Sequence, residues 1–270
     1  MRILAVIMFV ALLLASLIAK KSPEAYNLKP FGLPPAGSGS AKTPAKPDVE
    51  WTPGTAFKTT PIWGTIGAFL TAMVGEFLIW TQVVRFWTVD AKMSLATATN
   101  LYIFIGIAGI FTMPLLGRFA DYLVVRLGDE TKARKVMLIF APAVGAVACF
   151  ALLASGAGSF TIGVVACVLF AIYWAIEPGG CAGYAGSIYG RKSLGKIWGL
   201  ATLVVMGIGP ALGTYVGSAL GAAGSYVPSV RFALGAFVIS TVVALILPLA
   251  AKAPAAQPAA EPGSGKVQPA

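Results

Sequence analysis

The chain has 270 residues, of which 57% are hydrophobic and 11% are charged, and it carries a net charge of +10. This composition excludes an ordinary soluble domain. With apolar runs of about 20 residues, it predicts an all-α membrane protein with several transmembrane helices. The excess of Lys and Arg is explained by membrane topology, so no nucleic-acid partner is expected.

Side chains that carry most metal and hydrolytic chemistry are scarce. The sequence has no His, and its three cysteines, Cys149, Cys167 and Cys181, all fall within apolar runs without metal-ligand spacing. No nucleophile–base pair stands out either. We therefore expect no metal, no cofactor and no enzymatic activity.

Residues 1–20 contain the first apolar run, followed by Lys20 and Lys21. A cleaved signal peptide is an open alternative, because residues 15–19 contain small side chains. The heavier positive charge follows the run rather than preceding it, which favours a membrane helix with a cytoplasmic C-terminal end.

The rest of the chain divides into a linker, six spans and a tail. Residues 21–60 are rich in Pro, Gly, Ser and Lys and predict a cytoplasmic linker, whereas residues 252–270 are rich in Pro and Ala and predict a disordered cytoplasmic tail. Residues 61–251 predict six transmembrane helices, at about 63–85, 97–116, 136–155, 160–188, 197–222 and 231–250.

The distribution of Lys and Arg predicts the orientation. With seven spans and a cytoplasmic C-terminus, sixteen of these cations fall on the inner side and four fall outside. The four outer cations are Arg2, Arg85, Lys92 and Arg231. The opposite orientation would invert this bias.

A segment between the second and third of these six runs combines glycine, a carboxylate and several cations. We predict that it forms an inner gating loop, in which a guanidinium holds the carboxylate. The alternative is that the cations only mark a cytoplasmic loop. The residues are Gly117, Arg118, Asp121, Arg126, Arg134 and Lys135.

A second basic loop lies between the fourth and fifth runs. Its Gly-x-x-x-x-Gly-Lys spacing matches a phosphate-binding loop, but Ile197 stands where Ser or Thr is needed and no strand precedes it, so nucleotide binding is not expected. The residues of this second loop are Gly190, Arg191, Lys192, Gly195 and Lys196.

The helix after that loop has glycine at every fourth position and a proline among them. The glycines predict a face for close helix packing, and the proline predicts a kink suited to a helix that slides or bends. A generic packing face would explain the glycines but not the proline. These residues are Gly207, Gly209, Pro210, Gly213, Gly217 and Gly221.

Four polar residues in the spans are candidates for substrate binding or proton coupling. Glu76 lies within its helix, and Glu177 precedes Pro178-Gly179-Gly180, which predicts a helix break within the membrane. A carboxylate in hydrocarbon is costly unless it faces a wet cavity or a partner. Each could instead be a structural lock. Gln82 and Arg85 follow Glu76, and Arg85 could simply mark the outer interface.

Several of these segments resemble the major facilitator superfamily. Residues 117–135 resemble its loop motif G-x-L-A-D-x-x-G-R-[RK], with Phe119 for Leu and about eight residues inserted before Arg134. Residues 21–30 and 50–63 resemble the segments after its sixth span and before its seventh. Residues 207–213 resemble an antiporter glycine–proline motif, and residues 189–199 resemble a loop of the oxalate/formate and monocarboxylate branches.

The resemblance covers spans six to twelve. It implies a C-terminal six-helix half-bundle, preceded by one helix, that transports a small solute by alternating access, with an organic anion as the expected solute, as an antiporter in the inner membrane. It also implies that an N-terminal half, or a second copy, completes the cavity. A lone half would leave Glu76 and Glu177 against lipid. The alternative is a scaffold or assembly subunit that does not transport.

Overall fold

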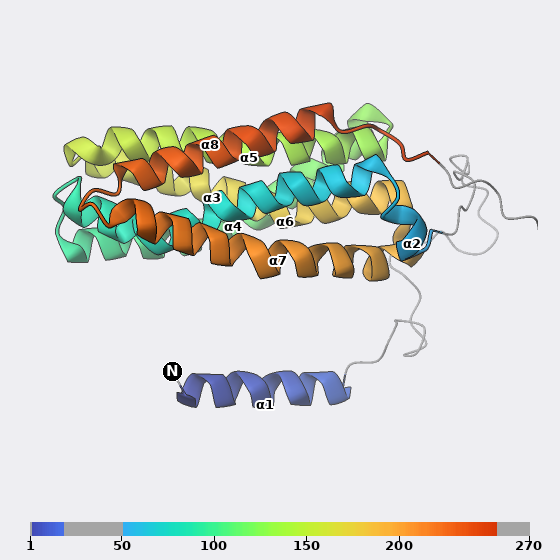
Figure 1. Ribbon diagram of the computed structural model, residues 1–270, viewed down its shortest axis with the longest axis horizontal. Coiled ribbons are helices and arrows are strands. Elements are labelled where there is room, and N and C mark those ends of the chain that lie inside the picture. The colour runs from blue at the N-terminus through green and yellow to red at the C-terminus, as the bar shows by residue number, and fades with distance from the viewer. Residues whose placement is uncertain (1, 19–50, 253–270) are drawn as a thin grey trace, which may run out of the picture. The chain divides into compact units, whose positions relative to one another are not determined.

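The computed structural model describes residues 2–18 and 51–252, which form two separate units (Figure 1). The first unit contains α1, Arg2–Ile18, an apolar helix of 17 residues. The predicted linker up to residue 50 and the tail from residue 253 lie outside the described residues. Every regular element that is described is helical, which confirms the predicted all-α class.

The second unit contains six helices that are long and apolar enough to cross a membrane. They are α3 (Thr60–Val89), α4 (Leu95–Leu127), α5 (Glu130–Ala154), α6 (Phe160–Tyr189), α7 (Arg191–Gly221) and α8 (Val227–Ile246). A short helix, α2 (Pro53–Ala56), precedes α3, and a 3-10 turn, η2 (Ser155–Ala157), follows α5. The six helices match the six predicted spans of the half-bundle.

Side-chain caps determine where several helices begin. The side chains of Ser94, Asp129 and Ser159 each accept a hydrogen bond from the backbone N–H three residues on, which starts α4, α5 and α6. Gly128 ends α4 in the left-handed conformation, with φ of 64°, a geometry that glycine adopts without a steric penalty.

The helices pack in a definite order. α3 lies against α7 and α8, α8 lies against α5, and α5 and α6 pack closely, with α4 on the far side of α6. The principal partner of α4 is therefore α6, and that of α7 is α3. As a result, 61% of the spanning stretch of α3 is buried, compared with 22% for α4 and 28% for α7.

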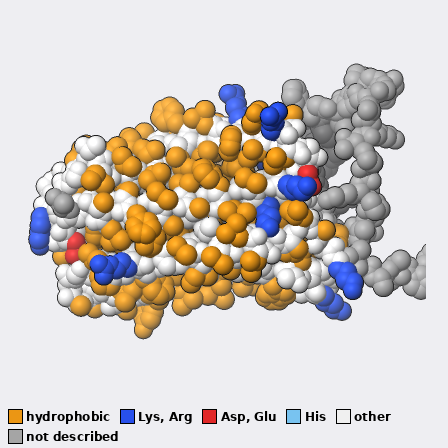
Figure 2. All heavy atoms as spheres, turned by 90° about the horizontal axis from the view of Figure 1, so that it is seen from above, with side chains coloured by type: hydrophobic (Ala, Val, Ile, Leu, Met, Phe, Trp, Pro, Cys, Tyr) orange, Lys and Arg blue, Asp and Glu red, His pale blue; other side chains and the backbone are white. Residues whose placement is uncertain are grey.

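Apolar and charged side chains occupy different zones of the surface. Hydrophobic side chains cover the middle of the face seen in Figure 2, and Lys and Arg lie mainly toward its two ends. Because hydrocarbon cannot solvate charged groups, this banding fits a bundle whose long axis crosses the bilayer.

The ordered bundle begins before the predicted boundary at residue 61. Trp51 is buried and meets the ring of Tyr189 edge-on, with centroids 5.1 Å apart. The Thr59 hydroxyl lies 2.6 Å from the Tyr189 hydroxyl. These contacts between aromatic and hydroxyl groups hold residues 51–59 against the ends of α6 and α7, so this part of the predicted linker belongs to the bundle.

Candidate functional site

Glu76 lies on α3 in the middle of the bundle, and 4% of it is exposed. Both of its carboxylate oxygens accept hydrogen bonds. Trp80 donates to Oε1 over 3.1 Å, and the Tyr173 hydroxyl on α6 donates to Oε2 over 2.8 Å. The Glu76 carboxylate is therefore satisfied within the bundle and links α3 to α6.

Glu177 lies on α6 one helical turn after Tyr173, and it is fully buried. Its Oε1 accepts a hydrogen bond from the Cys181 thiol over 3.4 Å. Its Oε2 has no hydrogen-bond partner among the described residues. A thiol is a weak donor, so the Glu177 carboxylate is poorly satisfied.

No cation compensates these two acids within the described residues. The ion pairs there join Asp121, Asp129 and Glu130 to cations of the loop region, and none of them includes Glu76 or Glu177. The sequence-based prediction that a lone half would leave both acids against lipid is wrong, because both side chains are buried within the bundle and Glu76 is bound by Tyr173 of α6. The predicted break after Glu177 is also wrong: α6 is continuous through Pro178.

Gln82 and Arg85 lie nearer the C-terminal end of α3. Gln82 is buried and donates to the Ser218 hydroxyl on α7 over 3.1 Å, while its Oε1 has no partner among the described residues. Arg85 is exposed and donates to the Tyr226 hydroxyl over 3.4 Å. Gln82 thus ties α3 to α7, and Arg85 lies at the end of the bundle rather than beside Glu76.

The α7 glycines lie on two different faces. Gly209, Gly213 and Gly217 lie directly against α3, where a Cβ on Gly209 would come within 2.7 Å of the Met73 Cβ and one on Gly213 would overlap the Val74 carbonyl. Gly221 packs on Tyr226. Gly207, by contrast, has open space above it and is not part of this contact. α7 is a continuous helix through Pro210.

The predicted gating loop is not a loop. α4 extends to Leu127 and α5 begins at Glu130, so only Gly128 and Asp129 separate the two helices. Two residues are enough because Gly128 ends α4 in the left-handed conformation and the Asp129 side chain caps the start of α5. Gly117 lies inside α4 with open space above it, and so it permits neither a turn nor a close helix contact.

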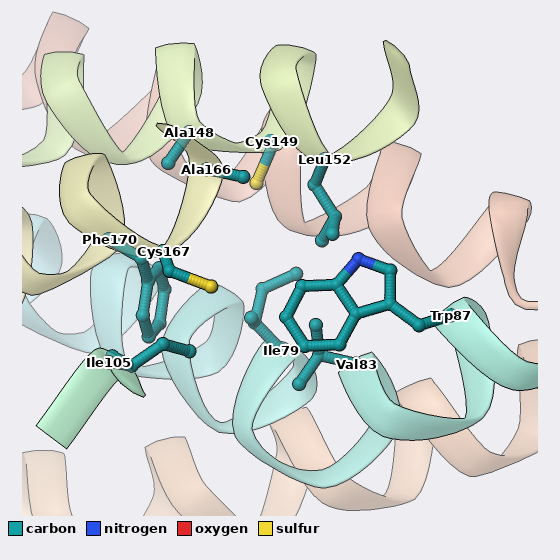
Figure 3. A pocket seen from close by; sticks show the side chains of 10 residues that line it. All are labelled: Ile79, Val83, Trp87, Ile105, Ala148, Cys149, Leu152, Ala166, Cys167 and Phe170. Carbon is teal, nitrogen blue, oxygen red and sulfur yellow. The ribbon is translucent and has the colours of Figure 1, made fainter. Parts of the chain in front are cut away.

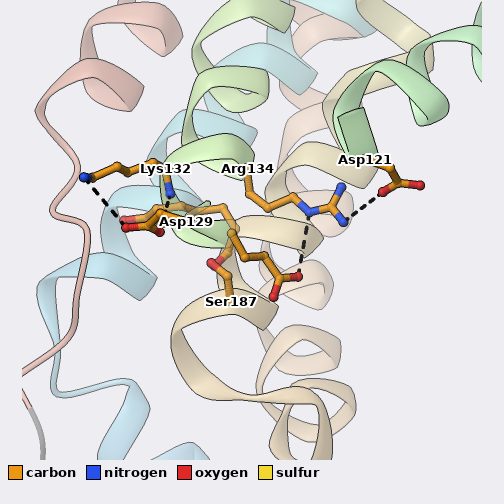
Figure 4. Close-up of polar contacts among 7 residues, drawn as sticks. Asp121, Asp129, Lys132, Arg134 and Ser187 are labelled. Atoms are coloured by element: carbon orange, nitrogen blue, oxygen red, sulfur yellow. Dashed lines mark hydrogen bonds and ion pairs between the residues drawn. The ribbon is translucent and has the colours of Figure 1, made fainter. Parts of the chain in front are cut away.

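The predicted pairing of Asp121 with a guanidinium is present (Figure 4). Arg134 on α5 contacts Asp121 on α4 over 3.3 Å, and its Nε lies 4.0 Å from Glu130. The Asp121 side chain is 75% exposed, so the pair itself contributes only about 0–1 kcal/mol to stability. Arg118 and Arg126 lie exposed on α4.

Lys135 binds backbone carbonyls, whereas Arg134 pairs with carboxylates. Its ammonium donates to the backbone carbonyls of Leu245 and Leu247, over 2.8 and 2.5 Å, at the C-terminal end of α8. The Tyr184 hydroxyl on α6 donates to the Pro248 carbonyl nearby. We call these three hydrogen bonds the α8 clamp. They satisfy carbonyls that a helix end leaves without partners.

The predicted second loop is also mostly helical. Only Gly190, with φ of 79°, lies between α6 and α7, and Arg191 starts α7. Gly195 and Lys196 lie exposed on the first turns of α7, and Lys192 belongs to the first turn of the same helix.

Two hollows in the bundle differ in character. The one in Figure 3 is a void of about 10 Å³ lined by apolar side chains, with Trp87 and Cys149 among them, and it is too small for a solute. The other, of about 140 Å³, lies between α4, α5 and α6 beside Gly117, Gly179 and Arg134. Among the described residues, no cluster of three or more His, Cys, Asp or Glu could hold a metal ion.

Three site residues escaped the sequence analysis: Trp80, Tyr173 and Cys181 as partners of the acids. For Trp80 and Cys181 a signal existed, because each follows its acid by four residues and so lies on the same helix face. Tyr173 is 97 residues from Glu76, and no local pattern links them.

Six helices that are long and apolar enough to cross a membrane define the class of multi-pass membrane proteins. The family model described as Major Facilitator Superfamily matches residues 1–213, and the chain belongs to that family. This assigns it to the membrane transport of a small solute. No curated protein matched the chain.

Proposed function

We propose that the chain is one half of a transporter that moves a small solute across the cell membrane by alternating access, completed by an N-terminal half or by a second copy. The observation that carries this proposal is the poor cover of α4 and α7, only 22% and 28% buried. In this family the solute binds near mid-membrane between two halves. In this proposal, α4 and α7 are the helices that meet the missing half.

The inner end of the bundle is proposed to be cytoplasmic. The start of α3, the end of α8 and both helix junctions at residues 128–129 and 190 meet at this end, as the contacts of Thr59 and Lys135 show. Most Lys and Arg of the described residues lie there, in line with the positive-inside rule. The C-terminus would then be cytoplasmic and the Asp121–Arg134 pair would form part of an inner gate.

The family match also bears on α1. Because the match starts at residue 1, it includes Arg2–Ile18, which favours a membrane helix over a signal peptide. Three finer predictions rest on the resemblances of residues 189–199 and 207–213 alone. They are antiport, an organic anion as the solute, and membership of the oxalate/formate branch, and they stay predictions.

Glu76 and Glu177 are the groups we propose for proton coupling. Both are buried in the spans, both lack a cation partner within the described residues, and one oxygen of Glu177 has no donor there. Such groups in membrane helices are costly, and they persist where transport uses their charge.

Native mass measurement after gentle detergent extraction tests the need for a second half. We expect a complex heavier than the 27.8 kDa chain, and we expect solute uptake by that complex, but not by the isolated chain, in liposomes. Gly213→Leu is a variant that should separate α7 from α3, and Gly235→Leu, in open space on α8, is its control. A monomer that transports alone would contradict the proposed assembly.

The second candidate is a scaffold subunit that does not transport. The burial of both acids favours it, because a half-bundle that covers its own acids can be stable in the membrane without a partner. A stable monomer without uptake, with no heavier complex in native membranes, would support this candidate over the transporter.

A further inference from the structure

A third hollow, of about 570 Å³, lies at the end of the bundle where α3 begins and α8 ends. Figure 1 shows α2, the start of α3 and the end of α8 together at this end. One wall carries Trp51, Lys58 and Thr60, and the other carries Pro248 and Lys252. No acid is found among the described residues that line it. The hollow is therefore basic and partly polar, unlike the apolar void of Figure 3.

The two lysines of this hollow are available to a ligand. Lys58 follows α2 and Lys252 follows α8, and both are exposed. Neither has an ion pair or a hydrogen bond within the part of the chain that the structure describes. By contrast, Lys132 and Arg134 at the same end of the bundle are already paired with carboxylates. The hollow thus holds two positive charges that no described acid neutralises.

The start of α3 adds partial positive charge to the hollow. α3 begins without a side-chain cap, since the Thr59 hydroxyl donates to the Ala56 carbonyl and lies against the Tyr189 hydroxyl instead. The N-terminus of a helix favours an anion. Thr60 and Pro61, the first two residues of α3, both line the hollow, and the Thr60 hydroxyl has no partner among the described residues.

The end of α8 would normally oppose an anion, because the last carbonyls of a helix carry partial negative charge. The α8 clamp removes this opposition. Lys135 binds the carbonyls of Leu245 and Leu247, and Tyr184 binds that of Pro248, which lines the hollow. The clamp therefore brings a third cation next to the hollow and holds its α8 wall in place.

The hollow lies at the level of the lipid headgroups. α8 has 20 residues and spans about 30 Å at 1.5 Å per residue, which is the thickness of the hydrocarbon core. The residues after Ile246 therefore emerge at the membrane boundary. Ile246 and Leu249 are 76% and 39% exposed, and Trp63 in the first turn of α3 is 54% exposed, as tryptophans at a membrane interface are. Acyl chains would find an apolar surface beside the basic hollow.

We infer that this hollow binds the phosphate of an anionic phospholipid, with Lys58 and Lys252 facing its charge and the Thr60 hydroxyl as a hydrogen-bond donor. The acyl chains would follow the apolar surface at Ile246 and Leu249. This surface favours a lipid over a free phosphate ion. Basic pockets between membrane helices bind the headgroups of anionic lipids in this way. The inference needs neither transport nor a second half, so its failure would leave the proposed function untouched.

Native mass spectrometry of the full chain from mixed micelles measures which lipids the protein retains. The probes are dioleoylphosphatidylglycerol and dioleoylphosphatidylcholine, which share their acyl chains and differ in net charge. The unchanged protein should retain phosphatidylglycerol on the order of tenfold better. The Lys58→Gln/Lys252→Gln variant should lose this preference. The Lys132→Gln/Lys196→Gln variant, which removes two exposed cations outside the hollow, is the control and should keep it.

Thr60→Glu is a second variant that preserves the start of α3. An acid in the first turn of a helix is favourable for the helix, but here it would repel a phosphate in the hollow. We expect Thr60→Glu to lose the preference for phosphatidylglycerol without a fall in melting temperature. Ala96→Glu, exposed in the first turn of α4, is the matched control and should keep the preference.

Three results would overturn the inference. The first is equal retention of the two lipids by the unchanged protein or full retention of phosphatidylglycerol by Thr60→Glu. The second is an equal loss of preference in the Lys132→Gln/Lys196→Gln variant, which would show a general attraction of cations for anionic lipid. The third is displacement of phosphatidylglycerol by an excess of inorganic phosphate, which would make a free anion the occupant.

Discussion

The bundle buries two acidic sites, and they are built differently. Glu76 receives two hydrogen bonds from aromatic donors, one from its own helix and one from α6. Glu177 receives one, from a thiol, and its second oxygen has no donor among the described residues. A satisfied buried group stabilises a fold, whereas an unsatisfied one costs about 1–3 kcal/mol. Of the two acids proposed for proton coupling, Glu177 is therefore the stronger candidate, and Glu76 is the one whose hydrogen bonds also stabilise the bundle.

The largest effect is expected from Glu177→Gln. An amide keeps the shape of the side chain but cannot release a proton, so uptake driven by a pH gradient should fall on the order of tenfold or more, the range of a typical coupling free energy. The protein should melt at the same temperature or higher, since the poorly satisfied carboxylate is gone. Uptake by the purified complex in liposomes and thermal melting measure the two effects.

Glu130→Gln, an exposed acid at the inner end of the bundle, is the control for that variant and should leave gradient-driven uptake unchanged. If the Glu177→Gln variant transported normally and melted at a lower temperature than the unchanged protein, Glu177 would stabilise the fold rather than couple protons.

A smaller effect, on stability, is expected from Tyr173→Phe. It removes the hydroxyl that donates to Glu76 Oε2 and leaves that buried oxygen without its donor. The free energy of unfolding should fall by about 1–3 kcal/mol, measured by denaturant unfolding in mixed micelles. Tyr102→Phe is the matched control: its ring packs on Trp80, and no hydrogen bond of its hydroxyl is described. Equal losses in both variants would argue that the ring contacts, rather than the Glu76 bond, stabilise this site.

The smallest effect is expected at Cys181. Serine offers Glu177 a stronger donor than the thiol, so Cys181→Ser should be more stable than Cys181→Ala by about 0.5–1.5 kcal/mol, as reported by the same unfolding assay. At Cys149, in the apolar void, serine gains no such partner and the order should be reversed. Identical unfolding of the two Cys181 variants would mean that the thiol contributes no hydrogen bond to the acid.

The sequence was sufficient for the spans and for the identity of the two acids. Apolar runs that are long enough to cross a bilayer predict membrane helices, and Glu76 and Glu177 stand out because they are ionisable residues within such runs. The helix ends were harder to predict, because α4 continues through the charged residues Arg118, Asp121 and Arg126, and the Asp129 cap starts α5 only two residues after α4 ends.

The direction in which each acid points could not be predicted. Whether Glu76 faces lipid, a cleft or a neighbouring helix depends on the rotation of α3 within the bundle, and contacts with α6, α7 and α8 set that rotation. The Tyr173 hydroxyl reaches Glu76 only once α6 lies beside α3. The same applies to Lys135, whose position beside Arg134 in sequence gives no sign that it binds the end of α8.

The α8 clamp has a mechanical consequence. Lys135 and Tyr184 hold the chain at Leu245, Leu247 and Pro248, where α8 ends. A pull applied to the C-terminus in a force-spectroscopy experiment would load these bonds before any turn of α8 unwinds. The first rupture would then report on two side chains from α5 and α6 rather than on the extraction of a helix from the bilayer.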